Sequence, residues 1–202
     1  WRERRILLIA DPHFGKAASF RSMGIAVPSG TTRDDLNRLG ALILKYQPEE
    51  LVVLGDLIHS AKSKGSEILL QFEEWRTGFS DLKITLIKGN HDRLSGRPPA
   101  ELRFDQIENA TRIGSVMLSH KPSAHAGRYT IAGHIHPAVR LKGIGGQRET
   151  LPCFYFSRQY AMLPAFGSFT GNHIIKPSPQ DQVYVIAGAE AIKVQPPLHV
   201  PL

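Results

Sequence analysis

The sequence predicts an α/β fold, in which strands alternate with helices in the first half and short strands fill the second half. Residues 6–10, 51–54 and 83–89 contain largely apolar runs with the length and composition of buried strands. Between the first two runs, apolar residues recur at helical spacing from Leu36 to Tyr46, and Pro48 ends the helix. This order of strand, helix and strand predicts a parallel βαβ unit.

The remaining elements follow from the same kind of pattern. Thr32-Arg33-Asp34-Asp35 resembles a helix-capping box with Asp in place of Glu. Residues 14–30 carry four Gly or Pro breakers and predict a long loop, whereas 66–79 predict a second long helix and 100–103 a short one. Short strands are predicted at 116–118, 129–132, 138–141, 153–157, 160–164, 183–186 and 191–194.

The composition is that of one soluble globular domain spanning residues 1–202. A hydrophobic content of 42% and a charged content of 21% are ordinary for such a domain. No apolar run approaches the roughly 20 residues of a membrane span, and the charged start shows no signal peptide. The single cysteine, Cys153, excludes an internal disulfide framework and fits a reducing compartment. We therefore expect a cytoplasmic protein with no membrane partner.

The charge distribution indicates an anionic partner. The net charge is +7, and residues 120–180 contain seven Lys or Arg side chains against a single acid, Glu149. A basic face of this kind favours nucleic acid or a phosphorylated substrate, although a solvated basic surface is the alternative. No basic run interleaved with aromatic residues, typical of single-strand binding, is present.

Side chains that can bind metal or transfer protons follow the predicted strands. The set consists of two carboxylates, one amide and five imidazoles: Asp11, His13, Asp56, Asn90, His91, His120, His134 and His136. In open α/β sheets, ligands bind at the carboxyl ends of strands. These mixed nitrogen and oxygen donors suit Mn, Fe, Zn or Ni better than Ca or Mg, and two ions sharing Asp56 would use the set economically.

Spacing supports this interpretation, but each fragment also has an ordinary one. Asp11 and His13 stand two residues apart, as do His134 and His136, and on an extended chain such pairs point the same way. A turn or a helix cap is the alternative for each fragment taken alone. The other four histidines are interpreted as surface or satisfied polar residues: His59, His125, His173 and His199.

Taken together, these fragments resemble a known family. Its motifs occur here in order as Asp11-Pro12-His13, Gly55-Asp56, Gly89-Asn90-His91-Asp92, an isolated His120, and Gly133-His134-Ile135-His136. Over residues 6–137 they are similar to the calcineurin-like metallophosphoesterases. The resemblance implies a four-layer α/β/β/α sandwich of two mixed β-sheets and a metal-dependent phosphoesterase.

The resemblance also implies which residues hold two divalent transition metal ions, with manganese expected first and Fe, Zn or Ni as alternatives. The first ion would be held by Asp11, His13, Asp56 and His136. The second would be held by Asp56, Asn90, His120 and His134.

Two further stretches resemble one branch of the family, the bacterial ligase-associated DNA-damage-response endonucleases (PdeM-like). They are Gly15–Arg21, continued by Val27–Thr32, and Leu163–Gly171. The branch implies an endonuclease on DNA, or RNA, in bacterial DNA repair, with a DNA ligase or helicase as functional partner. Lys16 and Arg21, just past the first motif, could contact a phosphate or could be solvated.

The expected mechanism is attack of metal-activated hydroxide on phosphorus. His91 is the candidate general acid for the leaving oxygen, because it is not assigned to a metal, and Asp92 would orient its ring. One alternative is a hydrolase of a small phosphate mono- or diester. A non-catalytic binding subunit is less favoured, because no ligand of the pattern is missing.

Overall fold

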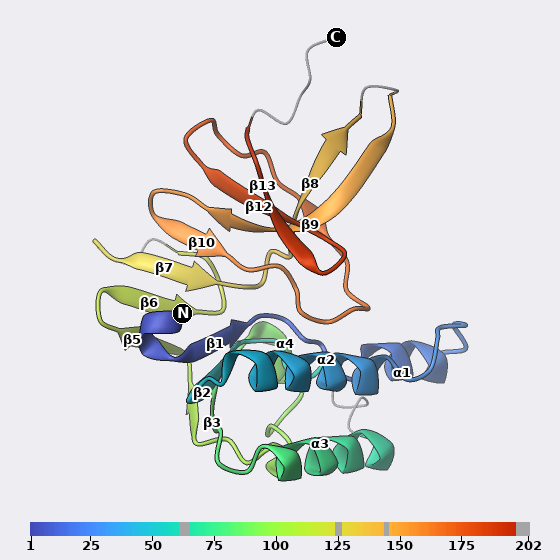
Figure 1. Ribbon diagram of the computed structural model, residues 1–202. Helices are drawn as coiled ribbons and strands as arrows, with labels where there is room; N and C mark the ends of the chain where they lie inside the picture. Colours follow the sequence, from blue (N-terminus) through green and yellow to red (C-terminus); the bar gives the residue numbers. More distant parts are fainter. Residues whose placement is uncertain (61–64, 124–126, 144–145, 197–202) are drawn as a thin grey trace.

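Two β-sheets pack face to face, and helices cover the outer face of the first sheet (Figure 1). This computed structural model describes residues 1–60, 65–123, 127–143 and 146–196. Within these ranges, no helix combines the length and the apolar character that crossing a membrane requires.

The first sheet is parallel throughout and has the order β1-β2-β3-β4. Its strands are β1 (Ile6–Ile9), β2 (Glu50–Leu54), β3 (Lys83–Ile87) and β4 (Gln106–Glu108). The α-helices of this half are α1 (Lys16–Ser22), α2 (Thr31–Tyr46), α3 (Ser66–Gly78) and α4 (Asn90–Leu94). Short 3-10 turns occur at Arg2–Arg4 and Ala100–Leu102.

Strand β2 shows why these runs are apolar without alternation. Leu51 and Val53 pack in the core between the first sheet and the helices. Val52 and Leu54 pack in a second core between the two sheets. Because both faces of the strand are buried, both sets of alternating side chains must be hydrophobic.

The second sheet has nine strands, and β9 connects its two halves. The strands are β5 (Ala110–Ile113), β6 (Val116–Ser119), β7 (Tyr129–Ala132), β8 (Pro137–Lys142), β9 (Arg148–Phe156), β10 (Tyr160–Met162), β11 (His173–Ile174), β12 (Gln182–Ala187) and β13 (Glu190–Val194). Residues 148–152 of β9 pair with β8, and residues 153–156 pair with β10 and β12. Strands β6 and β7 are parallel, so their carboxyl ends lie at the same edge.

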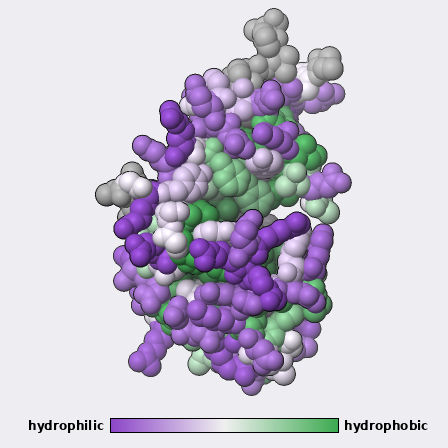
Figure 2. Space-filling model, turned by 60° about the vertical axis from the view of Figure 1, so that its left-hand side comes forward, coloured by the Kyte–Doolittle hydropathy of each residue, from purple (hydrophilic) through white to green (hydrophobic). Residues whose placement is uncertain are grey.

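An open hollow of about 600 Å³ lies on the second sheet and is lined by aromatic rings that include Tyr129, Phe156 and Tyr184. On the face shown in Figure 2, hydrophobic residues are exposed at mid-height and hydrophilic residues surround them. None of the predicted site residues lines this hollow.

The predicted α/β fold with two sheets is confirmed, and the details differ in three ways. The first sheet is parallel and not mixed. All described α-helices precede residue 95 and lie on the side of the first sheet, so in the described part of the chain no α-helix covers the second sheet's outer face (Figure 1). Helix α1 lies within 14–30, where a loop was predicted, because Ala17 and Ser19 find a buried environment that local sequence does not reveal.

The predicted capping box at Thr32 is wrong. Helix α2 begins at Thr31 after Gly30, and no side chain caps it. The Thr32 hydroxyl accepts a hydrogen bond from the Gly15 N–H at 3.1 Å, and both Asp35 oxygens accept from the Ser168 N–H at 3.2 Å. These side chains therefore join α2 to distant segments instead of closing its own first turn.

Candidate metal centre

The carboxyl ends of β1, β2, β3, β6 and β7 meet, and all eight predicted site residues gather there. Asp11 and Asp56 follow neighbouring parallel strands, and the Asp11 N–H donates to the Gly55 carbonyl at 3.2 Å. His120 follows β6 of the second sheet, and its Nε2 lies 3.5 Å from Asp56 Oδ1. The site thus spans the join between the two sheets.

The side chains form two adjacent groups, and within each group the potential ligand atoms all lie within 4.8 Å of one another. One group is Asp11, His13 and His136, and the other is Asp56, His120 and His134. Asp56 faces both groups, since its Oδ2 lies 3.8 Å from His13 Nε2 and its Oδ1 lies 3.5 Å from His120 Nε2. Asn90 Oδ1 lies 3.0 Å from His120 Nε2, which adds an oxygen to the second group.

The hydrogen bonds of two histidines leave lone pairs pointing into these groups. His120 Nδ1 lies 3.0 Å from the Leu54 carbonyl, and His136 Nδ1 lies 3.0 Å from the Gly171 carbonyl. A carbonyl only accepts, so each Nδ1 carries the hydrogen and each neutral ring presents Nε2 as an acceptor. Such backbone contacts are typical of metal-binding histidines.

The Nε2 atoms of both rings lie among other potential metal ligands. His120 Nε2 lies 3.0 Å from Asn90 Oδ1, 3.5 Å from Asp56 Oδ1 and 3.0 Å from His134 Nδ1, and His136 Nε2 lies 3.7 Å from Asp11 Oδ2. Asp11 is fully buried, and its Oδ1 has no hydrogen-bond partner within the described ranges. The residues present therefore fit divalent metal ions, which bind nitrogen and oxygen donors of this kind.

Burial favours the neutral form of His13 and His134, which is the form that binds a metal ion. Burial, followed by the nearby charges of His136 and His91, lowers the pKa of His13 to about 2. Burial is also the largest cause of the lowered pKa of His134. For His136 burial lowers the pKa, but the hydrogen bond and the charge of Asp11 outweigh it, and the pKa is raised.

The backbone reaches this geometry through an unfavourable conformation. Five of the eight residues have positive φ values: Asp11 (49°), His13 (45°), Asp56 (49°), His134 (69°) and His136 (52°). Left-handed backbone at non-glycine residues is uncommon, although Asp and His tolerate it better than most. The expected extended chain was therefore the wrong reason for the convergence of the two i, i+2 pairs.

Two motif glycines allow the loops to approach closely. A Cβ atom on Gly89 would lie 2.1 Å from Asp56 Oδ1, and one on Gly133 would lie 2.4 Å from Asp11 Oδ2. Any side chain at these positions would displace the carboxylate. Their role is close approach of backbone to ligand.

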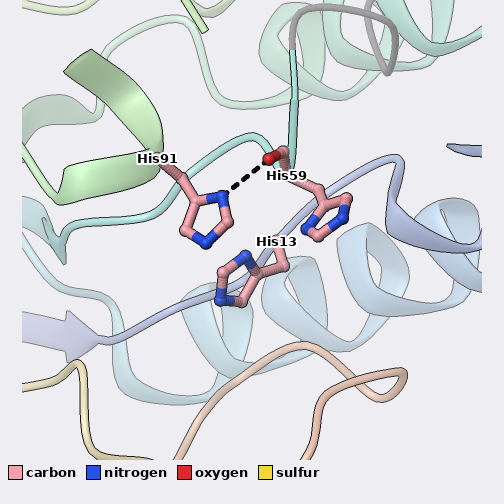
Figure 3. Close-up of side chains that lie close together, drawn as sticks. All are labelled: His13, His59 and His91. Carbon is pink, nitrogen blue, oxygen red and sulfur yellow. Dashed lines mark hydrogen bonds between the residues drawn. The ribbon is translucent and has the colours of Figure 1, made fainter. Parts of the chain in front are cut away.

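His91 lies beside the two groups and contacts His59 instead of Asp92. Its Nδ1 lies 2.8 Å from the His59 carbonyl oxygen, shown as the dashed line in Figure 3. The Asp92 carboxylate accepts from the backbone N–H groups of Leu57 (2.9 Å) and Gly89 (2.8 Å), and so caps α4. The expectation that Asp92 orients the His91 ring is therefore wrong, because its oxygens are used elsewhere.

His59 is a site residue that the sequence interpretation missed. Its ring is half-buried, stacks on His91 at 5.3 Å and lies 5.8 Å from His13 (Figure 3). Together the three histidines form a further group of potential ligands. The available signal in the sequence was the position of His59, three residues after the predicted ligand Asp56. His173 is exposed and outside the site, and His125 and His199 lie outside the described residues.

The two predicted phosphate-binding residues differ in position. Lys16 begins α1, and its backbone N–H donates to the His13 carbonyl at 3.1 Å, so it directly follows the first ligand pair. Burial is the largest cause of the lowered pKa values of His13 and His59, the charge of Lys16 adds to both, and burial lowers the pKa of Lys16 itself. Arg21 of α1 is exposed and donates to the Pro28 carbonyl, in the loop that follows the helix, at 2.7 Å. A phosphate-binding role for either residue stays a prediction.

Comparison with known proteins agrees with this site. The family model for calcineurin-like phosphoesterases matches residues 4–152, and no curated protein matches. Among solved structures, the chain is similar to the Pseudomonas putida nuclease MPE, with 36% identity and a TM-score of 0.81, over 96% of this chain and 90% of that one. The E. coli phosphoesterase Yfce is 14% identical with a TM-score of 0.46, over 94% and 98%. The Aquifex aeolicus protein AQ665 is 19% identical with a TM-score of 0.41, over 65% and 78%.

The fold and the site define a metal-dependent phosphoesterase. The chain belongs to the calcineurin-like phosphoesterase family, because the family model covers most of it and the nuclease matches nearly all of it. The family inferred from the five motifs is thereby confirmed, and the likeness to a nuclease agrees with the branch that residues 15–21, 27–32 and 163–171 indicated.

Proposed function

We propose that this protein is a dinuclear-metal-dependent phosphodiesterase that cuts DNA internally. The observation that carries the proposal is the position of Asp56, whose two oxygens face separate ligand groups. One carboxylate between two groups is the arrangement expected for a bridged metal pair. Asp11, His13 and His136 would share one cation with Asp56, and Asn90, His120 and His134 would share the other.

Divalent cations, when bound here, would neutralise phosphoryl charge and lower the pKa of a water molecule. The protein's own residues must then protonate the leaving oxygen. Because the His59 carbonyl holds His91 Nδ1–H, the opposite nitrogen, Nε2, is left to carry the transferable proton. We therefore assign His91 as the general acid and the His59 backbone as the group that orients it.

Two observations support a nucleic acid substrate. The similar Pseudomonas putida protein is a nuclease. Of the seven basic side chains in 120–180, only Lys142 is half-buried and the others are exposed, so their charge is available to a polyanion. We propose manganese as the metal. From the branch resemblance we also propose a role in bacterial DNA repair in the cytoplasm, alongside a DNA ligase or helicase.

A closed circle of single-stranded DNA tests the proposal, because only an internal cut makes it linear. Wild-type protein and His91→Ala would be incubated with the circle and Mn²⁺ side by side. Linear product from the wild type alone would support a metal-dependent endonuclease. An intact circle together with hydrolysis of a small phosphodiester would contradict it and favour the small-ester alternative. Inactivity on both, with no metal bound, would favour a binding subunit.

A further inference from the structure

Two sequence stretches that supply none of the predicted metal ligands meet beside the metal centre. Phe20 of α1 and Phe169, from the segment 163–171, contact each other edge to face with ring centroids 5.6 Å apart. Phe20 is also 6.1 Å from the His59 ring, tilted by 31°, and His59 stacks on His91 at 26°. A row of aromatic rings therefore leads from the Phe20–Phe169 pair to the candidate acid.

The pair is not explained by core packing. Both rings are partly exposed, and neither belongs to the three hydrophobic clusters found among the described residues. The nearby Phe14 and Phe72, by contrast, are buried at 3% and 0% exposure and belong to the helix–sheet core. Two half-open aromatic rings beside a charged site are available to a ligand.

The segment that carries Phe169 is fixed to the metal centre on both sides. The Phe166 N–H donates to the Ala10 carbonyl at 2.7 Å, directly before Asp11. The Ser168 N–H is held by Asp35, and the Gly171 carbonyl holds His136 Nδ1. In Figure 1 the segment after β10 descends toward the helices of the first half. Phe169 is therefore pre-positioned relative to the ligands, which reduces the entropic cost of binding.

Helix α1 presents a cation beside the ring. Lys16 and Phe20 are four residues apart, so they lie on the same face of the helix. The Lys16 N–H donates to the His13 carbonyl at 3.1 Å, and the Phe20 ring lies 6.1 Å from the His59 ring, so this helix face begins beside the site. One helix face thus offers a positive charge and an aromatic ring one turn apart. A cation can bind a nucleotide's phosphate, and an aromatic ring can stack on its base.

We infer that Phe20 and Phe169 form a stacking platform for a nucleobase next to the cleaved phosphate. This inference rests on the proposed function. The platform would give the enzyme a preference for single-stranded nucleic acid over small phosphate esters. Stacking of one base on an aromatic side chain contributes roughly 5- to 150-fold in binding. Because every base has an aromatic face, the platform would select for bases without selecting a sequence.

The test compares two single-stranded oligonucleotides that each contain one cleavable phosphodiester. They have the same backbone, but in the second the nucleotides on either side of that linkage are abasic. We expect wild-type protein with Mn²⁺ to show a kcat/KM roughly 10-fold or more higher on the base-containing strand. Phe20→Leu and Phe169→Leu keep much of the side-chain volume but remove the ring, so cleavage of the base-containing strand should slow more than that of the abasic strand and the preference should fall toward one. Phe20→Tyr should restore it.

Phe156→Leu is the matched control. Phe156 makes a similar edge-to-face contact with Tyr184 at 5.9 Å, but in the hollow on the second sheet, away from the histidines. It should keep the wild-type preference. Metal content and thermal midpoint would be measured for every variant, to verify that each one folds.

The outcomes separate this inference from the proposed function. Equal rates of the wild type on both strands would overturn the platform while leaving an endonuclease, and this comparison needs no variant. Phenylalanine variants that slow both strands equally would also overturn it, because a purely structural role predicts that result. A wild type that cuts neither strand but hydrolyses a small diester would overturn the proposed function and the platform together.

Discussion

The Nδ1 atom of His91 lies 2.8 Å from the backbone carbonyl oxygen of His59. A carbonyl oxygen can only accept a hydrogen bond, so in this contact the Nδ1 atom of His91 must carry the hydrogen. A substitution of the His59 side chain leaves the carbonyl in place, whereas a change in the loop after β2 would move it. The orientation of the candidate acid thus depends on the backbone beside Asp56.

Replacing His91 tests its role as the acid. We expect His91→Ala to keep its metal content and to lose about 10²- to 10⁴-fold in kcat on DNA, whose leaving alkoxide needs a proton. A diester with a stable phenolate leaving group should be hydrolysed at nearly the wild-type rate. His173→Ala, at an exposed histidine of β11, serves as control. An unchanged rate on DNA would remove His91 from the mechanism.

Replacing Asp56 tests the shared ligand. Because its two oxygens face different groups, Asp56→Ala should lower the content of both ions, as measured by elemental analysis after dialysis. Asp34→Ala, at an exposed acid of α2, should leave metal content unchanged. One full equivalent of metal remaining in Asp56→Ala would argue against a bridge.

Metal removal should destabilise the fold, because a bound ion stabilises the folded state and would neutralise the buried Asp11 carboxylate, whose Oδ1 has no hydrogen-bond partner among the described residues. Saturating Mn²⁺ at about 100 times its Kd stabilises the protein by about 2.7 kcal/mol per site, or about 5–10 °C in Tm for a chain of this size. Calorimetry with chelator and with Mn²⁺ would measure the difference. The absence of any shift would show that the groups do not bind the metal, and Asp56→Ala should show a smaller shift.

Asp92 should affect stability more than chemistry. Asp92→Ala removes the acceptor of two buried N–H groups, and we expect the free energy of unfolding in urea to fall by about 1–3 kcal/mol. Asp92→Asn keeps one acceptor oxygen and should cost less. If Asp92→Asn folded stably but lost as much DNA cleavage as His91→Ala, the carboxylate would have a catalytic role after all.

Cys153 should be chemically inert in the folded protein. The residue is fully buried in β9, and burial raises the pKa of its thiol to about 12. The reactive thiolate is therefore scarce at pH 8. A thiol-specific reagent should label the native protein slowly at this pH and should label it promptly in denaturant. Fast labelling without denaturant would show that β9 opens readily.

Much of the site could be predicted because its residues stand next to strong local signals. Asp11, Asp56 and His91 each follow a buried strand, and the five motifs are short enough to recognise without a structure. The contact of Asp92 with Leu57 could not be predicted, because Leu57 is 35 residues away and belongs to a loop after another strand. Helix α1 was missed because the glycine and proline residues on either side of it predict a loop, although the seven residues from Lys16 to Ser22 form a helix.

By itself, the sequence determined the order of most of the strands, the donor set at their carboxyl ends and the family, because these depend on hydrophobic runs and on spacing within a few residues; the short strands β4, β5 and β11 were not predicted. The tertiary structure alone decided that a backbone carbonyl orients His91, that five site residues adopt left-handed backbone, and that Phe20 meets Phe169. The physical reason is that these contacts join segments distant in sequence. Their geometry is set by the packing of two sheets, which no local pattern of side chains encodes.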